Sequence, residues 1–127
     1  MDECRTLLST HGVGRVAVSP SGGRPAVVPV NYDVVDDAIV FRTSPGSVTA
    51  AAAGTEVAFE VDHVDDAPSQ GWNVLAVGPA IPVTDPEVTG RLTRDAHTEP
   101  WAGGERMMWV SIRPTSLTGR RITAADQ

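Results

Sequence analysis

The segment RPAVVPVNYDVVDDAIVFRTSPGSVTAAAA, residues 24–53, decides how this chain folds. Apolar runs on both sides of Asp36-Asp37 predict two antiparallel strands joined by a tight turn. Ser44-Pro45-Gly46-Ser47 then breaks the second strand and precedes the short helix former VTAAAA. Because a helix start leaves backbone N–H groups free and Arg42 lies just before it, this junction suits an anion. The segment therefore raises the question of a phosphate-bearing cofactor.

The composition narrows the classes of function. We expect 127 residues to form one domain, residues 1–127, and a net charge of −6 argues against nucleic-acid binding. All ten basic residues are arginine, which excludes a lysine Schiff base and leaves arginine to recognise carboxylate or phosphate. No apolar run approaches the roughly 18 residues of a membrane span, and the acidic start MDECRT is unlike an export signal. We therefore expect a cytoplasmic protein without a membrane partner.

The first half of the chain predicts one helix and three strands. Apolar spacing predicts a helix over residues 2–11 that carries Cys4 and His11 on its packed face and stops at Gly12. Strands are expected at residues 15–19, 25–35 and 38–43, the third apolar on both faces. The short helix after Ser47 ends at Gly54.

The second half predicts further strands. Residues 56–62 alternate as a half-buried strand, residues 63–70 form a loop, and residues 71–83 form a long strand whose glycine and prolines imply a bend and an edge position. A capping-box pattern at residues 84–87 opens a helix to about residue 96. Strands at residues 106–113 and 116–122 complete a mainly β chain with short helices. Without a βαβ rhythm, the pattern favours an antiparallel barrel of six or seven strands.

A series of motifs carries a resemblance to a known family. In chain order they are GVGRVAV at residues 12–18, GGRPAVVPVNY at 22–32, IVFRTSPGS at 39–47, VAFEVD at 57–62, GWNVLAVGPA at 71–80, WVSIRP at 109–114 and TGRRI at 118–122. With these motifs the chain resembles the pyridoxamine 5'-phosphate oxidase-like family of FMN-binding split β-barrels, and more narrowly its short actinobacterial-type members. The resemblance covers nearly the whole chain.

The resemblance implies a homodimer that holds FMN non-covalently in two sites at the subunit interface. It places residues of two strands beside the flavin ring and its phosphate, helix-start residues at the phosphate, and other residues as walls from either subunit. These residues are Pro29, Val30, Asn31 and Tyr32 beside the ring, Phe41, Arg42, Thr43, Gly46, Ser47 and Val48 toward the phosphate, and Trp72, Asn73, Trp109 and Arg120 elsewhere in the site.

Val48 departs from the family pattern. Many relatives have a lysine there that reaches the phosphate, and losing such a charge-assisted contact weakens binding by roughly ten- to a hundredfold. Arg42, with Arg120 or Arg121, would then have to suffice. Alternatives on the same fold are the deazaflavin F420, whose acidic tail would suit an arginine groove, and a non-catalytic flavin-binding, haem-binding or ligand-free member.

The remaining chemistry-bearing residues give weaker signals. The segment DHVDD at residues 62–66 reads as a solvated acidic loop rather than a metal site. His63 and His97 are kept as candidate haem ligands only because some relatives bind haem through histidine. No nucleophile with an evident base appears, as expected where a flavin carries the electrons of an oxidoreductase and its small-molecule substrate. Oxidation of pyridoxamine phosphate itself is not expected, because no further basic cluster exists for a second phosphate.

Overall fold

The structure is a computed structural model that describes residues 2–9, 11–19, 23–44, 47–65, 70–95 and 108–123. These residues form three short helices and seven strands, all paired antiparallel. The elements are α1 (Asp2–Leu8), β1 (His11–Val18), β2 (Ala26–Val35), β3 (Ala38–Thr43), α2 (Val48–Ala51), β4 (Glu56–Asp65), β5 (Gln70–Val83), α3 (Pro86–Asp95), β6 (Met108–Ile112) and β7 (Ser116–Ile122).

Six of the strands close into a barrel. The order is β1, β2, β3, β6, β5 and β4, and the β4–β1 pairing closes the circle. The seventh strand, β7, pairs with β5 over residues 71–77, whereas β6 pairs with β5 over residues 80–83. β6 and β7 therefore follow one another along the same edge of β5. The expected split antiparallel β-barrel is confirmed.

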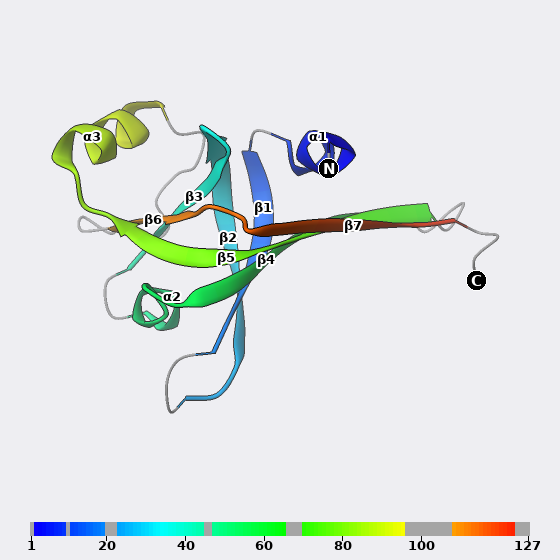
Figure 1. Ribbon diagram of the computed structural model, residues 1–127, viewed down its shortest axis with the longest axis horizontal. Helices are drawn as coiled ribbons and strands as arrows, with labels where there is room; N and C mark the ends of the chain where they lie inside the picture. The colour runs from blue at the N-terminus through cyan, green and yellow to red at the C-terminus, as the bar shows by residue number, and fades with distance from the viewer. Residues whose placement is uncertain are drawn as a thin grey trace.

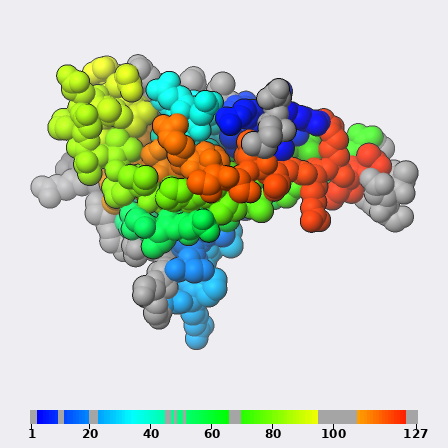
Figure 2. Space-filling model, in the orientation of Figure 1, coloured from blue at the N-terminus to red at the C-terminus, as the bar shows by residue number. Residues whose placement is uncertain are grey.

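The ends of β4, β5 and β7 continue past the barrel as a three-stranded extension, which we call the arm (Figure 1). In Figure 1, α3 lies at the end of the molecule opposite the arm, and α1 lies over β1 on the arm side. The β1–β2 hairpin projects from the body on its own (Figure 2). The barrel thus has a closed body and two open projections.

The central hairpin of residues 24–53 forms as expected. Asp36 and Asp37 both have positive φ, 51° and 67°, as a two-residue type I′ turn requires. The turn sets Val35 opposite Ala38 and Tyr32 opposite Phe41. Both faces of β3 are covered, because Ala38, Ile39, Val40 and Phe41 are all buried. The acidic pair therefore fixes the register that buries β3.

The core fills the barrel. Tyr32 and Phe59 are fully buried and meet edge to face, with ring centroids 4.9 Å apart. Gly14 makes room for this pair, since a Cβ at that position would lie 2.3 Å from the Phe59 ring. The alternating apolar pattern thus directs the Tyr32 and Phe59 rings into the core. The absence of a side chain at Gly14 lets β1 lie close to the Phe59 ring.

The first helix is shorter than the sequence suggests. The helix expected over residues 2–11 ends at Leu8, Ser9 takes a left-handed φ of 64°, and His11 begins β1 instead of lying on a helix face. Two tertiary contacts account for the difference. The Tyr32 hydroxyl donates to the Leu8 carbonyl, and β1 pairs with β2 from His11 onward. Strand pairing therefore overrides the helical spacing after Leu8, and β1 starts four residues earlier than expected.

The expected edge position of the long strand is confirmed at the glycine and prolines that suggested it and wrong for residues 71–77. Residues 71–77 have β4 on one side and β7 on the other. Among the described pairings, Gly78 and Pro79 have β4 alone, and Pro82 has β6 alone. The expected loop over residues 63–70 is also shorter, because β4 continues to Asp65 and β5 starts at Gln70. Pairing between β4 and β5 extends both strands.

α3 begins with the expected capping signal. The Glu87 backbone N–H donates to Asp85 Oδ1 at 2.9 Å, so that Asp85 is the N-cap and Pro86 occupies the first helical position. Leu92 and Val88 then pack on Trp109 and Val40. α3 therefore covers the outer face of β3 and β6. No helix in the described parts of the chain is long and apolar enough to cross a membrane.

Candidate functional site

Three hydroxyl groups meet where β3 leads into α2. The Oγ1 atom of Thr43 lies 2.7 Å from Ser47 Oγ and also contacts Thr49 Oγ1, and Ser47 Oγ lies 3.0 Å from Thr49 Oγ1. The Ala50 backbone N–H donates to Ser47 Oγ at 3.1 Å, which caps the helix. We call this group the hydroxyl corner. It is built by a β-strand end and a cap that the sequence specifies locally.

Arg42 lies on a different side of the strand from the hydroxyl corner. Its guanidinium carbon sits 4.7 Å from the centre of the Trp109 ring, directly across β3 and β6. Successive residues of a strand face opposite sides, so Arg42 and Thr43 leave β3 in opposite directions. In one chain the structure therefore does not bring the Arg42 side chain together with Ser47.

Trp109 is a buried support for α3. Only 3% of its surface is exposed, and its indole N–H donates to Thr93 Oγ1 at 3.2 Å. This contact satisfies the polar end of the ring. The single chain thus uses Trp109 to hold α3 over the barrel and to stack Arg42.

The predicted flavin-side strand divides between core and surface. Val30, Tyr32 and Phe41 are buried in the barrel core, and burial raises the pKa of the Tyr32 hydroxyl. Their side chains face inward, so a ligand outside the barrel would meet only their backbone atoms. Pro29 is exposed and Asn31 half-buried, opposite Arg15 and Val13 of β1.

A groove on the arm gathers a second set of predicted residues. Its volume is about 410 Å³, within the size range of small-molecule sites. It contains Trp72, Asn73 and Arg120, and Asn73 pairs across the strands with Asp62 on one side and Arg120 on the other. The full lining is Glu60, Asp62, Val64, Asp65, Gln70, Gly71, Trp72, Asn73, Arg120 and Ile122. We call it the arm groove.

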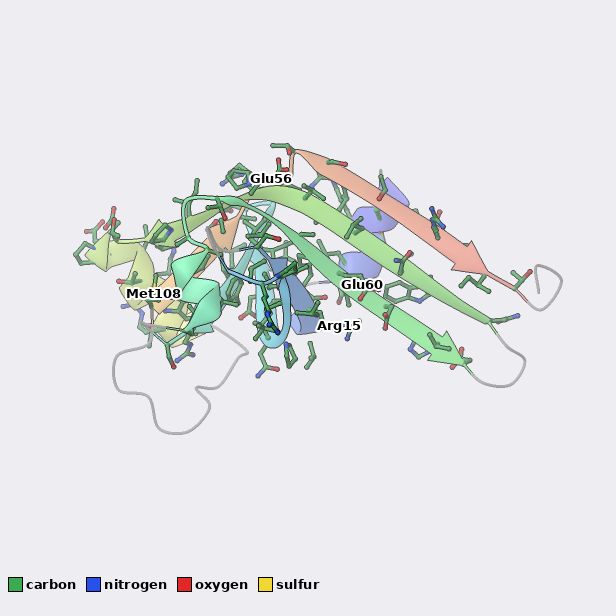
Figure 3. The ribbon with its side chains drawn as sticks, turned by 90° about the horizontal axis from the view of Figure 1, so that it is seen from below. Arg15, Glu56, Glu60 and Met108 are labelled. Carbon is green, nitrogen blue, oxygen red and sulfur yellow. The ribbon has the colours of Figure 1, made fainter. Side chains whose placement is uncertain are left out.

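The carboxylates at the barrel end of the arm groove were not anticipated from the sequence. Arg15 of β1 donates to Glu60 Oε1 from Nε at 3.0 Å and from Nη2 at 2.6 Å, and Nη2 lies 2.9 Å from Asp62 Oδ2. Figure 3 shows Arg15 and Glu60 beside one another, with Glu56 farther back along β4. The hydrogen bond to Glu60 is the main cause that raises the pKa of Arg15, and burial opposes it. The alternating sequence of β4 places Glu60 and Asp62 on one face of the strand, and this alternation was the signal from which their proximity could have been predicted.

His63 is oriented by two neighbours at the outer part of the arm. Its Nε2 lies 3.0 Å from Asp65 Oδ1, and its ring is stacked on Trp72 with centroids 6.3 Å apart. No cluster of three or more His, Cys, Asp or Glu side chains suited to a metal ion occurs in the described portion of the chain. Gly46 and His97 lie outside the described residues, and Val48 is described only as the first residue of α2.

The hydroxyl corner and the arm groove lie at opposite ends of β4 (Figure 3). α2 precedes Glu56 at the start of the strand, whereas the groove begins at Glu60 and extends to Asp65. The four residue steps from Glu56 to Glu60 span about 13 Å of extended chain. A single chain therefore keeps the two groups of predicted site residues apart.

Comparison with known proteins gives a consistent set of relatives. The family described as pyridoxamine 5'-phosphate oxidase matches residues 1–121. An uncharacterised protein of Mycobacterium tuberculosis, Rv0080, is 38% identical over 97% of this chain and 83% of its own length.

Two solved structures are similar over almost the whole chain. The FAD-binding protein of Mycobacterium smegmatis is 32% identical, with a TM-score of 0.81 over 96% of this chain and 94% of that one. A protein of Corynebacterium glutamicum, provisionally described as a pyridoxamine 5'-phosphate oxidase, is 28% identical, with a TM-score of 0.79 over 96% and 89%. Sequence and structure comparisons thus point to the same group of flavin-binding split barrels.

Proposed function

The chain belongs to the pyridoxamine 5'-phosphate oxidase family, and on that premise we propose that it is a flavin-dependent oxidoreductase acting as a homodimer. The observation that carries the proposal is the separation of the hydroxyl corner from the arm groove within one chain. A two-fold axis brings different regions of the two copies together, so the corner of one copy meets the groove of the other. Each dimer then has two equivalent cofactor sites.

The hydroxyl corner and the arm groove hold different parts of the cofactor. The hydroxyl corner supplies the half-buried Ser47 as a hydrogen-bonding group for a phosphate, and the buried Thr43 and Thr49 position it. The arm groove supplies the Asn73 amide for the ring. A bound flavin supplies the capacity to accept or donate electrons, while these residues position it and exclude water.

The donor set of the hydroxyl corner fits a phosphate with one negative charge better than a phosphate dianion. The corner consists of neutral hydroxyls, Arg42 is stacked on Trp109, and Val48 stands where many relatives have lysine. The terminal phosphate dianion of FMN depends more on a cationic partner than the diphosphate of FAD, which has one negative charge on each phosphorus. FAD is therefore a candidate beside FMN, in agreement with the FAD-binding relative from Mycobacterium smegmatis.

The absorption spectrum of the protein as isolated tests the proposal. A bound flavin gives a yellow protein, and release by denaturation followed by chromatography and mass measurement separates FMN, FAD and F420. Titration of cofactor-free protein with each compound then ranks their affinities. A colourless protein that binds none of the three at high micromolar concentration would refute flavin dependence.

Mixing two defective variants tests the shared site. Ser47→Asp keeps a good helix cap but places a carboxylate against the phosphate, and Asn73→Ala removes the amide from the groove. Neither homodimer should bind flavin well. After random exchange of subunits, about a quarter of all sites should be intact and bind flavin, because each mixed dimer combines both defects in one site. Recovery of no binding, with subunit exchange verified, would show that both groups act within one chain or that they do not share a cofactor.

A further inference from the structure

The arm groove carries an excess of negative charge. Three carboxylates line it, from Glu60, Asp62 and Asp65, against the single guanidinium of Arg120. Arg15 borders the groove through its bonds to Glu60 and Asp62, and counting it still leaves one more negative than positive charge. Such a lining attracts cations into a partly enclosed space.

Arg15 leaves acceptor oxygens of both carboxylates to the groove. Both hydrogen bonds to Glu60 end on Oε1, and the contact to Asp62 is to Oδ2. Each carboxylate has about four acceptor positions on its two oxygens. Glu60 and Asp62 are 28% and 38% exposed, so a ligand can reach them while solvent screens them incompletely. The two neighbouring carboxylates thus present N–H acceptors at the barrel end of the groove.

The rest of the groove suits an apolar body. Val64 and Ile122 are exposed on either side of it, and Gly71, which lies between them across the strands, adds no side chain there. Arg120 lies two strands from Asp62, about 10 Å away, with Asn73 between them. An anion at the barrel end would therefore face Glu60 and Asp62, because Arg120 is distant and Arg15 is already bonded to both carboxylates.

We propose that the arm groove binds a small ligand with a cationic nitrogen group, an amine or an amidine, held by Glu60 and Asp62. Its apolar body lies against Val64 and Ile122. Only the assignment of this ligand as the substrate rests on the proposed flavin-dependent function. Binding itself requires no flavin, so the two proposals fail separately.

Three probes of nearly equal shape test the charge preference. Benzamidine is a cation, benzamide is neutral and benzoate is an anion, and each is titrated into the protein as isolated, with its flavin content measured separately. Benzamidine should bind at least about tenfold more tightly than benzoate, with benzamide between them. Its affinity should fall as salt is raised. Equal binding of the three probes, or no binding of benzamidine, overturns the proposal whatever the flavin content.

Matched variants locate the bound cation. Glu60→Gln and Asp62→Asn keep side-chain size and remove one charge each, and each should weaken benzamidine binding about tenfold. Glu56→Gln removes a charge from the same face of β4 but outside the groove, and should leave binding unchanged. Undiminished benzamidine binding in both groove variants overturns the assignment. If a variant fails to fold, chemical-shift changes in the wild-type protein on adding benzamidine decide instead: they must centre on residues 60–64 and 71–73.

Discussion

The barrel body and the arm use the same strands in different ways. Inside the body, β4 and β5 bury Phe59, Val61, Val74 and Ala76, and the polar Tyr32 hydroxyl finds its acceptor within the chain. Along the arm, the same two strands leave charged and apolar side chains exposed, and Arg15 is shared between two carboxylates. The body thus stabilises the fold, whereas the arm leaves polar and apolar side chains accessible.

The largest test of this difference compares one aromatic side chain of the body with one aliphatic side chain on the outer face. Phe59→Ala removes a fully buried ring and should lower the free energy of unfolding by about 3–5 kcal/mol. Leu75→Ala on β5 should cost much less, because that side chain is 37% exposed. Chemical denaturation of both variants measures the two costs. Similar losses would show that the outer face is covered as thoroughly as the core.

The hydroxyl corner is tested by restoring a cation. Val48→Lys should tighten FMN binding by roughly ten- to a hundredfold, about 1.5–3 kcal/mol, because an ammonium group at the start of α2 would contact the phosphate. The gain for FAD should be smaller, since each phosphorus of its diphosphate carries only one negative charge. Fluorescence titration with both flavins measures the change. An unchanged FMN dissociation constant would mean that the phosphate binds elsewhere.

The buried Tyr32 hydroxyl of the barrel body gives a further contrast with the exposed polar groups of the arm. Tyr32→Phe leaves the Leu8 carbonyl without its donor and should cost about 1–3 kcal/mol. Burial raises the folded-state pKa of Tyr32, so its contribution to stability is complete below the unfolded pKa of about 10 and is lost as pH rises above it. Denaturation between pH 8 and 11 should therefore show a smaller alkaline loss in Tyr32→Phe than in wild type, and equal losses would contradict this role.

The smallest expected effect concerns the charges of the arm. Glu60→Gln weakens a partly exposed ion pair and should change the free energy of unfolding by about 1 kcal/mol or less. Thermal denaturation beside Glu56→Gln measures it. A loss of unfolding free energy comparable to that of Phe59→Ala would show that the Arg15–Glu60 ion pair stabilises the fold as much as a core side chain does.

The sequence predicted elements best where local signals and tertiary pairing agree. Asp36-Asp37 fixes a turn in any context, and the alternation of residues 56–62 holds in β4. His11 was assigned to the wrong element because its helical spacing from Cys4 competes with pairing to Asp33, which is distant in the chain. The expected edge position of β5 holds at its glycine and prolines and fails over residues 71–77, because prolines report the local backbone, whereas the neighbours of the rest of a strand are set by long-range pairing.

The sequence named candidate site residues but not their arrangement, and their role in binding a cofactor stays a prediction. Asn73 and Arg120 share the arm groove, whereas Arg42 stacks on Trp109. Glu60, Asp62 and Arg15 went unnoticed because only the β1–β4 pairing brings them together.

The sequence by itself determined the type of most elements, the turn and the hydroxyl cap, since these depend on backbone preferences within a few residues. It also contained the motifs that mark the family. Tertiary structure alone decided that β4 separates the hydroxyl corner from the arm groove, and that Arg15 lies between Glu60 and Asp62. The physical reason is that antiparallel pairing sets which distant residues are neighbours, and alternation along each strand sets which of them share a face.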